Sequence, residues 1–185
     1  MKLSPGLLRS VTAAAEQKLT FARQWLLYDA RHQNPFESAE LIAAILEGKN
    51  KPIAHHHVDA GDHVVVINCK EISMPWYEWK FRMYYHHTDY AGGASWTAAW
   101  ELHDKNPTKV LEKAVYRVVR GDLMRRLRMA RLHLYADENV PNDIWTNLTS
   151  QIRQLRPVPR KLEEIPEEER KKFPKLFDFP KDFVF

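Results

Sequence analysis

The segment YYHHTDYAGG, residues 84–93, places two adjacent histidines between tyrosines and a pair of glycines. A histidine pair can bind a metal ion, transfer a proton, or hydrogen-bond and stack against nucleic acid. No third metal ligand accompanies His86 and His87 at a regular spacing, and no nucleophile is visibly paired with them. The first two kinds of chemistry are therefore not expected of this segment.

Two interpretations of the segment remain open. In one, Tyr84 and one of the histidines finish a β-strand and pack inside the protein. In the other, the segment is a loop at a strand end that lies against RNA. The glycine pair would then let the backbone approach a phosphate, and the histidines and the following tyrosine would hydrogen-bond to bases or stack on them. The residues that would contact RNA in that case are His86, His87, Tyr90, Gly92 and Gly93.

A second histidine cluster, His55–His57, is followed by Asp59, and imidazole and carboxylate are both good zinc ligands. Neighbouring residues on a strand or loop point in different directions, so three consecutive histidines rarely converge on one ion. The spaced HExxH pattern is absent, and Cys69 is the only cysteine, which excludes cysteine-based metal clusters and an intrachain disulfide. We expect no metal or other cofactor, and we interpret the cluster as a loop that touches phosphate or packs against a neighbour.

Enzymatic sites have little support in the sequence. A dinucleotide-binding fold needs glycines after its first strand, but residues 29–34, which follow the first expected strand, contain none. The Walker pattern is also missing, and no serine stands in a nucleophile-elbow context. We expect a protein that is not an enzyme. The alternative is a metal- or nucleotide-dependent enzyme that uses the histidine-rich loops.

The clearest signal is a run of arginines in residues 117–131, where Asp122 is the single acidic residue. Arginines at positions 125, 128 and 131 recur at helical spacing, and the pattern predicts an opposite, apolar face. Two interpretations remain: a basic face in solvent, or arginines whose mutual repulsion is relieved by a phosphate backbone, which the planar guanidinium matches well. The residues expected on the apolar face are Leu123, Leu127 and Ala130.

These residues are positioned by alternating strands and helices. Apolar, β-branched runs predict buried strands, and Asn-Pro pairs followed by apolar residues at helical spacing predict helices. The absence of polar alternation in VVVIN indicates a strand covered on both faces, as in a parallel sheet. The expected strands are 25–28, 64–68, 80–85 and 132–135, and the expected helices begin at Asn34, Asn106, Leu123 and Asn142, the last of them running to Leu155.

The two ends of the chain differ from this α/β pattern. Residues 1–23 are basic and rich in Ala, Ser and Thr, which suits either an organelle transit segment or an ordinary amphipathic helix. Residues 156–185 are rich in proline and phenylalanine and carry a glutamate cluster, so they are expected to dock in grooves of a larger partner. We therefore predict one α/β domain, 24–155, between a basic N-terminal extension, 1–23, and a C-terminal extension, 156–185. No apolar run is long enough for a membrane-spanning helix.

The ordered set of these segments resembles the large-subunit ribosomal protein thirteen family, and in particular its mitochondrial branch. The matching landmarks are Lys51, HVDAGDHVVVIN, the YYHHTDYAGG segment, Asn106-Pro107, Ala114-Val115-Tyr116, Arg125-Arg126 and RLHLYADENVP. The resemblance spans roughly residues 25–162. Two departures are the loop Val118–Gly121, where the family has Met-Leu-Pro-Lys, and the aromatic turn at Trp76 and Tyr77, which replaces a small basic turn of bacterial members and predicts a protein contact there.

Membership would imply a three-layer α/β/α fold with a mostly parallel four-stranded sheet and extended terminal segments. It would also imply a structural role in the large ribosomal subunit of mitochondria, in the matrix, where the protein binds and stabilises large-subunit rRNA. The C-terminal extension and the Trp76/Tyr77 turn would contact neighbouring ribosomal proteins. A free-standing RNA-binding regulator is a further alternative. Besides the residues of the histidine segment, the predicted RNA contacts are Lys49, Lys51, Arg117, Arg120, Arg125, Arg126, Arg128 and Arg131.

Overall fold

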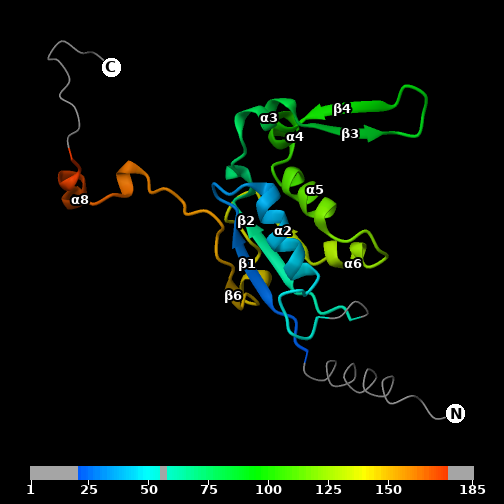
Figure 1. The fold of residues 1–185 in the computed structure, drawn as a ribbon, viewed down its shortest axis with the longest axis horizontal. Coiled ribbons are helices and arrows are strands. Elements are labelled where there is room, and N and C mark those ends of the chain that lie inside the picture. The colour runs from blue at the N-terminus through cyan, green and yellow to red at the C-terminus, as the bar shows by residue number, and fades with distance from the viewer. Residues whose placement is uncertain (1–20, 55–57, 175–185) are drawn as a thin grey trace.

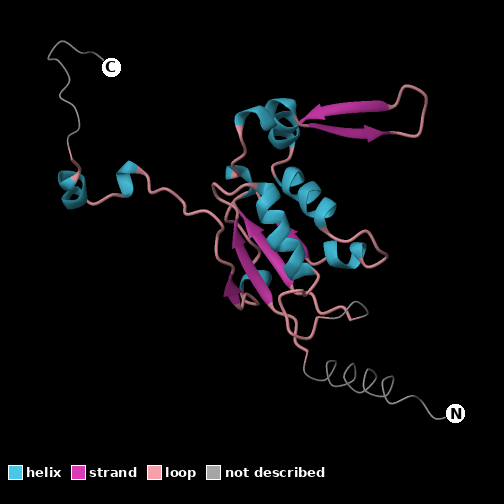
Figure 2. Ribbon diagram, viewed as in Figure 1, coloured by secondary structure: helices cyan, strands magenta, loops and turns pink. Residues whose placement is uncertain are grey.

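The computed structural model describes residues 21–54 and 58–174 (Figures 1 and 2). Strands and short helices alternate along this part of the chain. Their order is β1 (Trp25–Asp29), α2 (Pro35–Leu46), β2 (His63–Ile67), the 3-10 turn η1 (Cys69–Glu71), α3 (Trp76–Phe81), β3 (Met83–His87), β4 (Ala94–Ala98), α4 (Ala99–Lys105), α5 (Thr108–Val118), α6 (Arg125–Met129), β5 (Leu132–Leu134), α7 (Asn142–Trp145), β6 (Ser150–Gln151), η2 (Leu162–Glu164) and α8 (Glu167–Lys172).

The centre of the molecule is a four-stranded sheet with the order β5-β2-β1-β6, in which all pairs are parallel. Helices α2 and α5 lie side by side over one face, and the connection that carries α7 passes behind the other (Figure 1). Val64 to Ile67 of β2 are all buried, as expected for a strand covered on both faces. The predicted α/β class with a parallel four-stranded sheet is confirmed.

The residues predicted to begin and end the first helix, and those predicted to form the apolar face of α5, have these roles in the structure. The Asn34 side chain accepts a hydrogen bond from the Phe36 amide at 3.0 Å and so caps α2. Gly48 follows the helix with a φ of +75°, and a Cβ there would lie 2.6 Å from the Ala60 carbonyl carbon, so this position requires glycine. Helix α5 buries Val110, Leu111 and the residues one turn later against α2. The core therefore lies between these two helices and the sheet.

The strand predicted at residues 80–85 is wrong in both its bounds and its place. Residues up to Phe81 form α3, where Arg82 and Glu78 make an ion pair of 3.0 Å across one helical turn. The strand that follows, β3, pairs antiparallel with β4 and forms a separate two-stranded hairpin. Aromatic residues favour both a strand and a packed helix, so the sequence pattern did not distinguish the two.

The helix predicted from Asn142 to Leu155 is also wrong. Only Asn142–Trp145 is helical, and the chain then pairs with β1 as strand β6. Thr149 donates its amide hydrogen to the Trp25 carbonyl, and Ile152 donates to the Leu27 carbonyl, each at 2.8 Å. The open edge of β1 offers these tertiary hydrogen bonds, and they override a local helical preference.

The described part of the C-terminal extension leaves the sheet after residue 156. Arg156 holds the point of departure, because its backbone exchanges hydrogen bonds with the Gln33 side chain and its guanidinium pairs with Glu37 at 2.6 Å. Beyond it, η2 and α8 lie apart from the sheet (Figure 1). No helix in the described part of the chain is both long enough and apolar enough to span a membrane.

Candidate nucleic-acid interface

The histidine segment runs along β3 and through the turn at the tip of the β3–β4 hairpin, which projects from the body of the domain (Figure 1). Tyr84 is half-buried and packs against the core, whereas His86 and His87 are both exposed. Burial raises the pKa of the Tyr84 hydroxyl, so this tyrosine is a neutral anchor. Of the two interpretations left open by the sequence, packing inside therefore holds for the tyrosine but for neither histidine.

The two glycines of this hairpin have different roles. Gly92 adopts a φ of +73° with open space around it, so it permits a close approach of another molecule. A Cβ on Gly93 would collide with the Thr88 hydroxyl and would lie 2.9 Å from the Tyr90 carbonyl oxygen. Gly93 is therefore required by the turn itself, which is closed by hydrogen bonds between its backbone and that of Thr88 and Tyr90.

Exposed aromatic rings lie on the hairpin itself. Tyr90 is 81% exposed at the tip, and Trp96 of β4 is 61% exposed. The ring of Tyr85 lies 4.8 Å from that of Trp96, between centroids, so the two rings form one apolar surface. Tyr85 and Trp96 were not among the predicted contact residues. They are directly opposite each other on β3 and β4, and an aromatic residue on each side of a glycine-containing turn is the signal that could have identified this cross-strand pair.

The arginine segment has the opposite orientation to the predicted one. Leu123 is 97% exposed and Leu127 is also exposed, whereas Arg128 and Arg131 turn inward. The predicted apolar face is therefore wrong. The physical reason is that the inward arginines find carboxylates and backbone carbonyls at the sheet edge. A buried guanidinium with such partners is stable, and with the arginines turned inward the leucines are left exposed.

Arg131 is a structural residue, being only 7% exposed. Its guanidinium binds both carboxylate oxygens of Asp59, at 2.5 and 2.8 Å, and donates to the Leu46 carbonyl at 2.9 Å. Arg23 pairs with the same carboxylate at 3.1 Å. Burial raises the pKa of Asp59, but the two arginines outweigh that effect and leave its pKa below the ordinary value. Arg131 is thus held by the fold and is not available to a ligand.

Arg128 is held in a similar way. Its guanidinium donates to both oxygens of Asp122 at 3.1 Å and lies 3.8 Å from a carboxylate oxygen of Glu47. Burial raises the pKa of Glu47. Lys49, the Arg120 amide and Arg128 lower it by more than burial raises it, so the pKa lies below the ordinary value. The ionised Glu47 side chain is therefore the centre of a small charge network at the end of α2.

Arg125 supports the loop that precedes its own helix. It donates to the Val119 carbonyl at 3.1 Å and to the Arg120 carbonyl at 3.3 Å, and its guanidinium lies 4.4 Å from the centre of the Tyr116 ring. Gly121 makes this possible, because a Cβ there would lie 2.7 Å from the guanidinium. The loop that departs from the family pattern is thus stabilised by Arg125.

The remaining predicted cations differ in their availability. Arg117 and Arg126 are exposed, and neither forms an ion pair with any residue in the described ranges. Arg120 is exposed, 3.9 Å from Asp122. Lys49 is exposed although it pairs with Glu47 at 2.6 Å, whereas the Lys51 side chain is 16% exposed and bound to the buried Asp62 at 2.5 Å. The best-presented positive charges are therefore those of Arg117 and Arg126.

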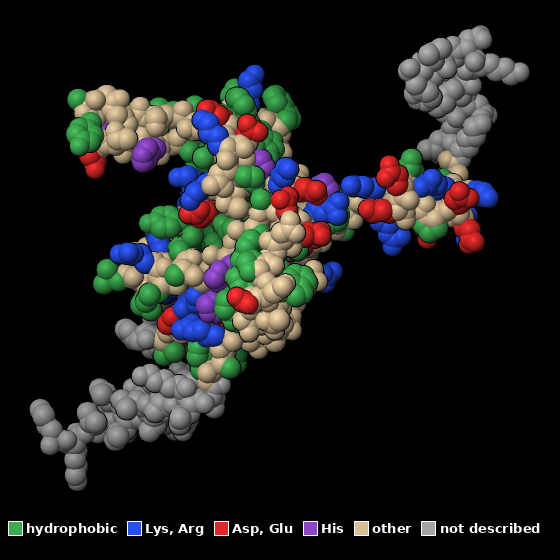
Figure 3. Space-filling view, turned by 180° about the vertical axis from the view of Figure 1, so that it is seen from behind, with side chains coloured by type: hydrophobic (Ala, Val, Ile, Leu, Met, Phe, Trp, Pro, Cys, Tyr) green, Lys and Arg blue, Asp and Glu red, His purple; other side chains and the backbone are tan. Residues whose placement is uncertain are grey.

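These charges and the hairpin lie on the same side of the molecule. In Figure 1 the β3–β4 hairpin, the end of α5 and helix α6 all project to the right of the sheet. The view from behind in Figure 3 shows basic and apolar side chains interspersed below the hairpin on that side. The surface combines positive charge with exposed rings, which is the composition of sites that bind single-stranded nucleic acid.

Metal binding gains no support from the described residues. Within residues 21–54 and 58–174, no three His, Cys, Asp or Glu side chains form a group that could hold a metal ion. The His55–His57 cluster lies outside those ranges. Cys69 is buried, and burial raises its pKa to about 12, so it is an unreactive thiol.

Comparison with known proteins agrees with the resemblance noted in the sequence. The family model for ribosomal protein L13 matches residues 23–141. The chain belongs to the ribosomal protein L13 family. The large ribosomal subunit protein uL13m of Drosophila melanogaster is 52% identical over 175 residues, which cover 95% of this chain and 98% of that protein. The predicted resemblance to this family and to its mitochondrial branch is confirmed.

Bacterial members of the L13 family match a shorter part of the chain. The large ribosomal subunit protein uL13 of Acholeplasma laidlawii is 37% identical over 117 residues, which cover 63% of this chain and 82% of that protein. The corresponding protein of Thermosipho africanus is 37% identical over 120 residues, covering 65% and 80%. The bacterial relatives therefore match a smaller share of this chain than the insect relative does.

One landmark of the L13 resemblance, the segment HVDAGDHVVVIN, acquires a structural explanation. Asp59 and Asp62 hold Arg131 and Lys51 respectively, and Gly61 lies between them where a Cβ would collide with the Leu46 carbonyl oxygen. This part of the motif fixes the sheet edge.

The aromatic pair Trp76 and Tyr77 was predicted to form a turn, but it begins helix α3, with both rings exposed and in edge-to-face contact.

Proposed function

We propose that this protein is a structural constituent of the large subunit of the mitochondrial ribosome, in the mitochondrial matrix, and that it binds and stabilises large-subunit rRNA. Family membership supports the ribosomal role. The observation that carries the RNA-binding part is the shared surface of unpaired arginines and exposed rings on one side of the domain. The role is non-catalytic, because binding at such a surface requires only charge and stacking.

Within that surface, Arg117 and Arg126 bind phosphates through their exposed guanidinium groups. Arg120 and Lys49 add positive charge beside them. Each phosphate contact releases counterions, so the affinity for rRNA falls with salt by a log-log slope of about −0.7 to −0.9 per contact. An association that is insensitive to salt would contradict this assignment.

The hairpin supplies contacts of another kind. His86, His87 and Tyr90 are exposed at its tip and contact bases by hydrogen bonds or stacking. Gly92 allows the backbone to approach a phosphate, since no atom of the protein lies near its missing Cβ. Gly93 stays in the contact region, although its own role is to close the turn.

Four predicted cations are assigned to the fold in this proposal. The guanidinium groups of Arg125, Arg128 and Arg131 and the ammonium group of Lys51 already have partners within the protein. Moving them to a phosphate would leave carboxylates or carbonyls without partners, which is costly for a buried group. They therefore position the contact surface and do not bind RNA themselves.

Contacts with neighbouring ribosomal proteins are assigned to the exposed Trp76 and Tyr77 and to the C-terminal extension. Both residues of the pair are more than half exposed, although large aromatic side chains usually bury most of their surface. Large exposed rings are enriched where proteins associate. Phe177 and the later phenylalanines of the extension lie outside the described residues.

The decisive experiment is incorporation into the particle. The double variant Arg117→Glu/Arg126→Glu should be reduced in the large-subunit fraction of a mitochondrial lysate separated by sedimentation, while its far-UV circular dichroism stays unchanged. The matched control is Lys70→Glu/Arg153→Glu, which reverses two exposed charges of the same domain that are assigned to no contact. Unchanged incorporation of the double variant would mean that the arginine surface is only solvated.

The same gradient tests the alternatives. A free-standing RNA-binding regulator would not co-migrate with the large subunit, whereas a structural constituent would. Metal analysis of the purified protein tests the enzyme alternative, for which stoichiometric zinc or manganese would be required.

A further inference from the structure

Strand β5 forms an open edge of the parallel sheet. In the order β5-β2-β1-β6 its only neighbour in the described structure is β2. Val64 of β2 donates to the Arg131 carbonyl at 3.0 Å, and Tyr135 donates to the Val66 carbonyl at 2.9 Å. A parallel ladder uses alternate residues of a strand, so Leu132 and Leu134 direct their N–H and C=O groups away from β2. The edge therefore presents two donors and two acceptors at regular spacing.

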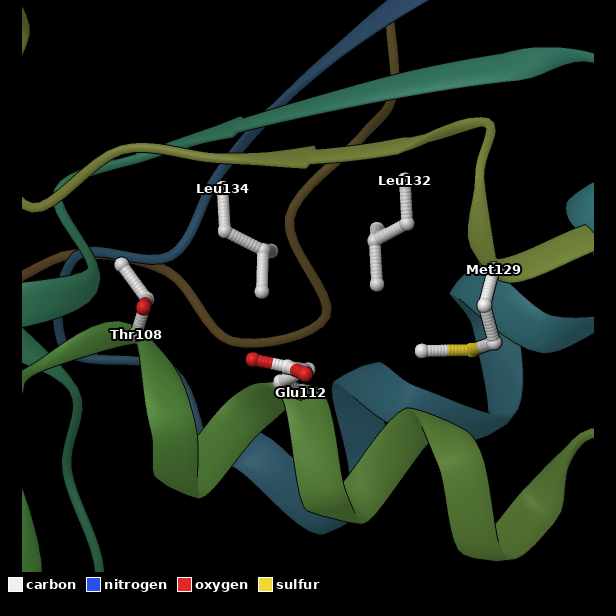
Figure 4. Close-up of a pocket in the computed structure, with 5 residues that line it drawn as sticks. All are labelled: Thr108, Glu112, Met129, Leu132 and Leu134. Atoms are coloured by element: carbon white, nitrogen blue, oxygen red, sulfur yellow. The ribbon is translucent and has the colours of Figure 1, made fainter. Parts of the chain in front are cut away.

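A cavity of about 270 Å³ lies directly beneath this edge (Figure 4). Leu132 and Leu134 extend into it from the strand, Met129 closes one end, and Thr108 and Glu112 rise from α5 on the opposite side. Small-molecule sites usually have a volume of roughly 300 to 1,000 Å³. The cavity is smaller than that range, with apolar side chains on the β5 side and polar ones on the α5 side, so it suits one side chain of a neighbouring chain better than a cofactor.

The edge also lacks the features by which proteins protect such strands. Edges that stay in solvent usually carry lysine, proline or a bulge, or are covered by another segment. Leu132–Leu134 carries no proline and no lysine, and both leucines are half-buried beside the cavity. None of the described residues pairs with the outward backbone groups of β5.

We propose that the β5 edge binds an extended segment of another protein, which adds as a fifth strand and inserts one apolar side chain into the cavity beneath. A basic side chain two residues away would reach Glu112, because alternate residues of a strand lie on the same face. This inference rests on the proposed ribosomal function only in that the partner would be another protein of the large subunit. It assigns a contact separate from Trp76, Tyr77 and the RNA-binding surface.

The charge of Glu112 and the outward backbone groups of β5 favour a peptide strand over RNA or a second copy of this chain. Lys109 contacts one oxygen of Glu112 at 2.7 Å, and the other oxygen is left for a cationic or amide group. RNA is disfavoured, since its phosphates would meet this carboxylate and the carbonyl groups of the edge. A second copy of this chain would bring a second Glu112 in place of a cation. A peptide strand satisfies the donors, the acceptors and the cavity together.

Amide hydrogen exchange at single-residue resolution tests the proposal, on the purified protein and on isolated large subunits. The Leu132 and Leu134 amides should exchange at least about tenfold more slowly in the subunit, as for amides that gain a stable hydrogen bond. His133 is the internal control, because its amide points toward β2 and should be protected in both samples. Equal exchange of Leu132 and Leu134 in the two samples would overturn the proposal.

A photo-crosslinking residue at Thr108, on the rim of the cavity, identifies the occupant. The expected product in large subunits is sensitive to protease and resistant to nuclease, and its crosslinked peptide contains an apolar residue with Lys or Arg two positions away. A nuclease-sensitive product, or a crosslink to a second copy of this chain, would overturn the assignment to another protein. The matched control is the same residue at Lys113, which is exposed on α5 and does not line the cavity.

Two variants connect the crosslink to the edge. Leu134→Pro removes one outward donor while leaving the donors to β2 intact, and Glu112→Gln removes the charge. Each should weaken the crosslink by roughly threefold to tenfold, the value of one hydrogen bond. Unaltered crosslinking in both variants would contradict the proposal. Absence of the wild-type protein from the large subunit would instead overturn the proposed function, and this inference with it.

Discussion

Arg131 and Asp59 form a two-pronged ion pair, with distances of 2.5 and 2.8 Å, between residues 72 positions apart in the sequence. The same guanidinium binds the carbonyl of Leu46, at the C-terminal end of α2, where a positive charge is favourable. One arginine from a strongly basic run thus joins the start of β5, the loop before β2 and the end of α2. It is a component of the fold.

Replacing this arginine should destabilise the protein. In Arg131→Met, the half-buried Asp59 keeps only Arg23 and the Leu46 carbonyl loses its donor, and loss of such charged hydrogen bonds costs about 2 kcal/mol. The free energy of unfolding, measured by urea denaturation, should fall by that amount. Arg126→Met is the control, since this exposed side chain should change stability by less than about 0.5 kcal/mol. Equal effects of the two variants would contradict the structural role.

Gly61→Ala should disturb the same junction from the backbone side. The added Cβ would collide with the Leu46 carbonyl oxygen and would lie 2.6 Å from the Arg131 guanidinium. We expect a loss of at least about 2 kcal/mol of unfolding free energy, as for other strained or overpacked sites. Gly92→Ala, where the space is open, is the comparison and should lose only about 1 to 2 kcal/mol from its positive φ. If Gly61→Ala were as stable as the wild type, the backbone at this junction would be able to move away from the added Cβ, and the predicted collision would be contradicted.

The stability of the protein should fall as the pH drops below about 6.5, the ordinary histidine pKa. His63 stacks on Trp25 with ring centroids 4.1 Å apart, and His133 lies beside both. Burial lowers the pKa of His63, helped by the positive charges of His133 and Arg131, and burial also lowers the pKa of His133.

The sign of this dependence follows from proton uptake. As the pH falls, the unfolded chain binds protons before the folded one does, so the stability present above the ordinary pKa is lost as the pH falls through the lowered folded values. The Tm should therefore decrease from pH 7.5 to pH 5.5. The decrease should be smaller in His63→Gln/His133→Gln, and unchanged in His86→Gln on the exposed hairpin. An equal decrease in all three proteins would contradict this origin.

The inverted orientation of the arginine segment can be tested with leucines. Leu123→Ala should change the unfolding free energy by less than about 0.5 kcal/mol, because the side chain is 97% exposed. Leu111→Ala, in the core of α5, should cost about 2 to 5 kcal/mol. A large loss in Leu123→Ala would restore the amphipathic helix that the sequence pattern indicated.

Stacking by the hairpin predicts an effect on RNA affinity without an effect on folding. Tyr90→Ala and Trp96→Ala should each weaken binding to large-subunit rRNA by about 1 to 3 kcal/mol, the contribution of one stacked base. Filter binding at fixed salt measures this change. Trp145→Ala on α7 is a matched loss of an exposed ring at a distance from the hairpin and should bind normally. Normal binding by both hairpin variants would remove the hairpin from the interface.

Local chemistry was sufficient to predict the central elements of this protein. The uninterrupted β-branched run of β2 requires burial on both faces, and Asn34 and Gly48 set the bounds of α2 through a cap and a positive φ. These outcomes depend on neighbours in the sequence and on residue type, so they can be read from one chain. The ordered landmarks were likewise enough to indicate the family.

The tertiary structure decided which of the predicted cations face outward. A helical repeat of arginines has the same pattern whether the guanidinium groups meet solvent or carboxylates, and the carboxylates of Asp59 and Glu47 come from distant segments. Strand β6 was decided in the same way, because the free edge of β1 converts a locally helical sequence into a strand. Which side of a basic helix is buried depends on long-range contacts that no local pattern contains. The same is true of the strand with which a segment pairs.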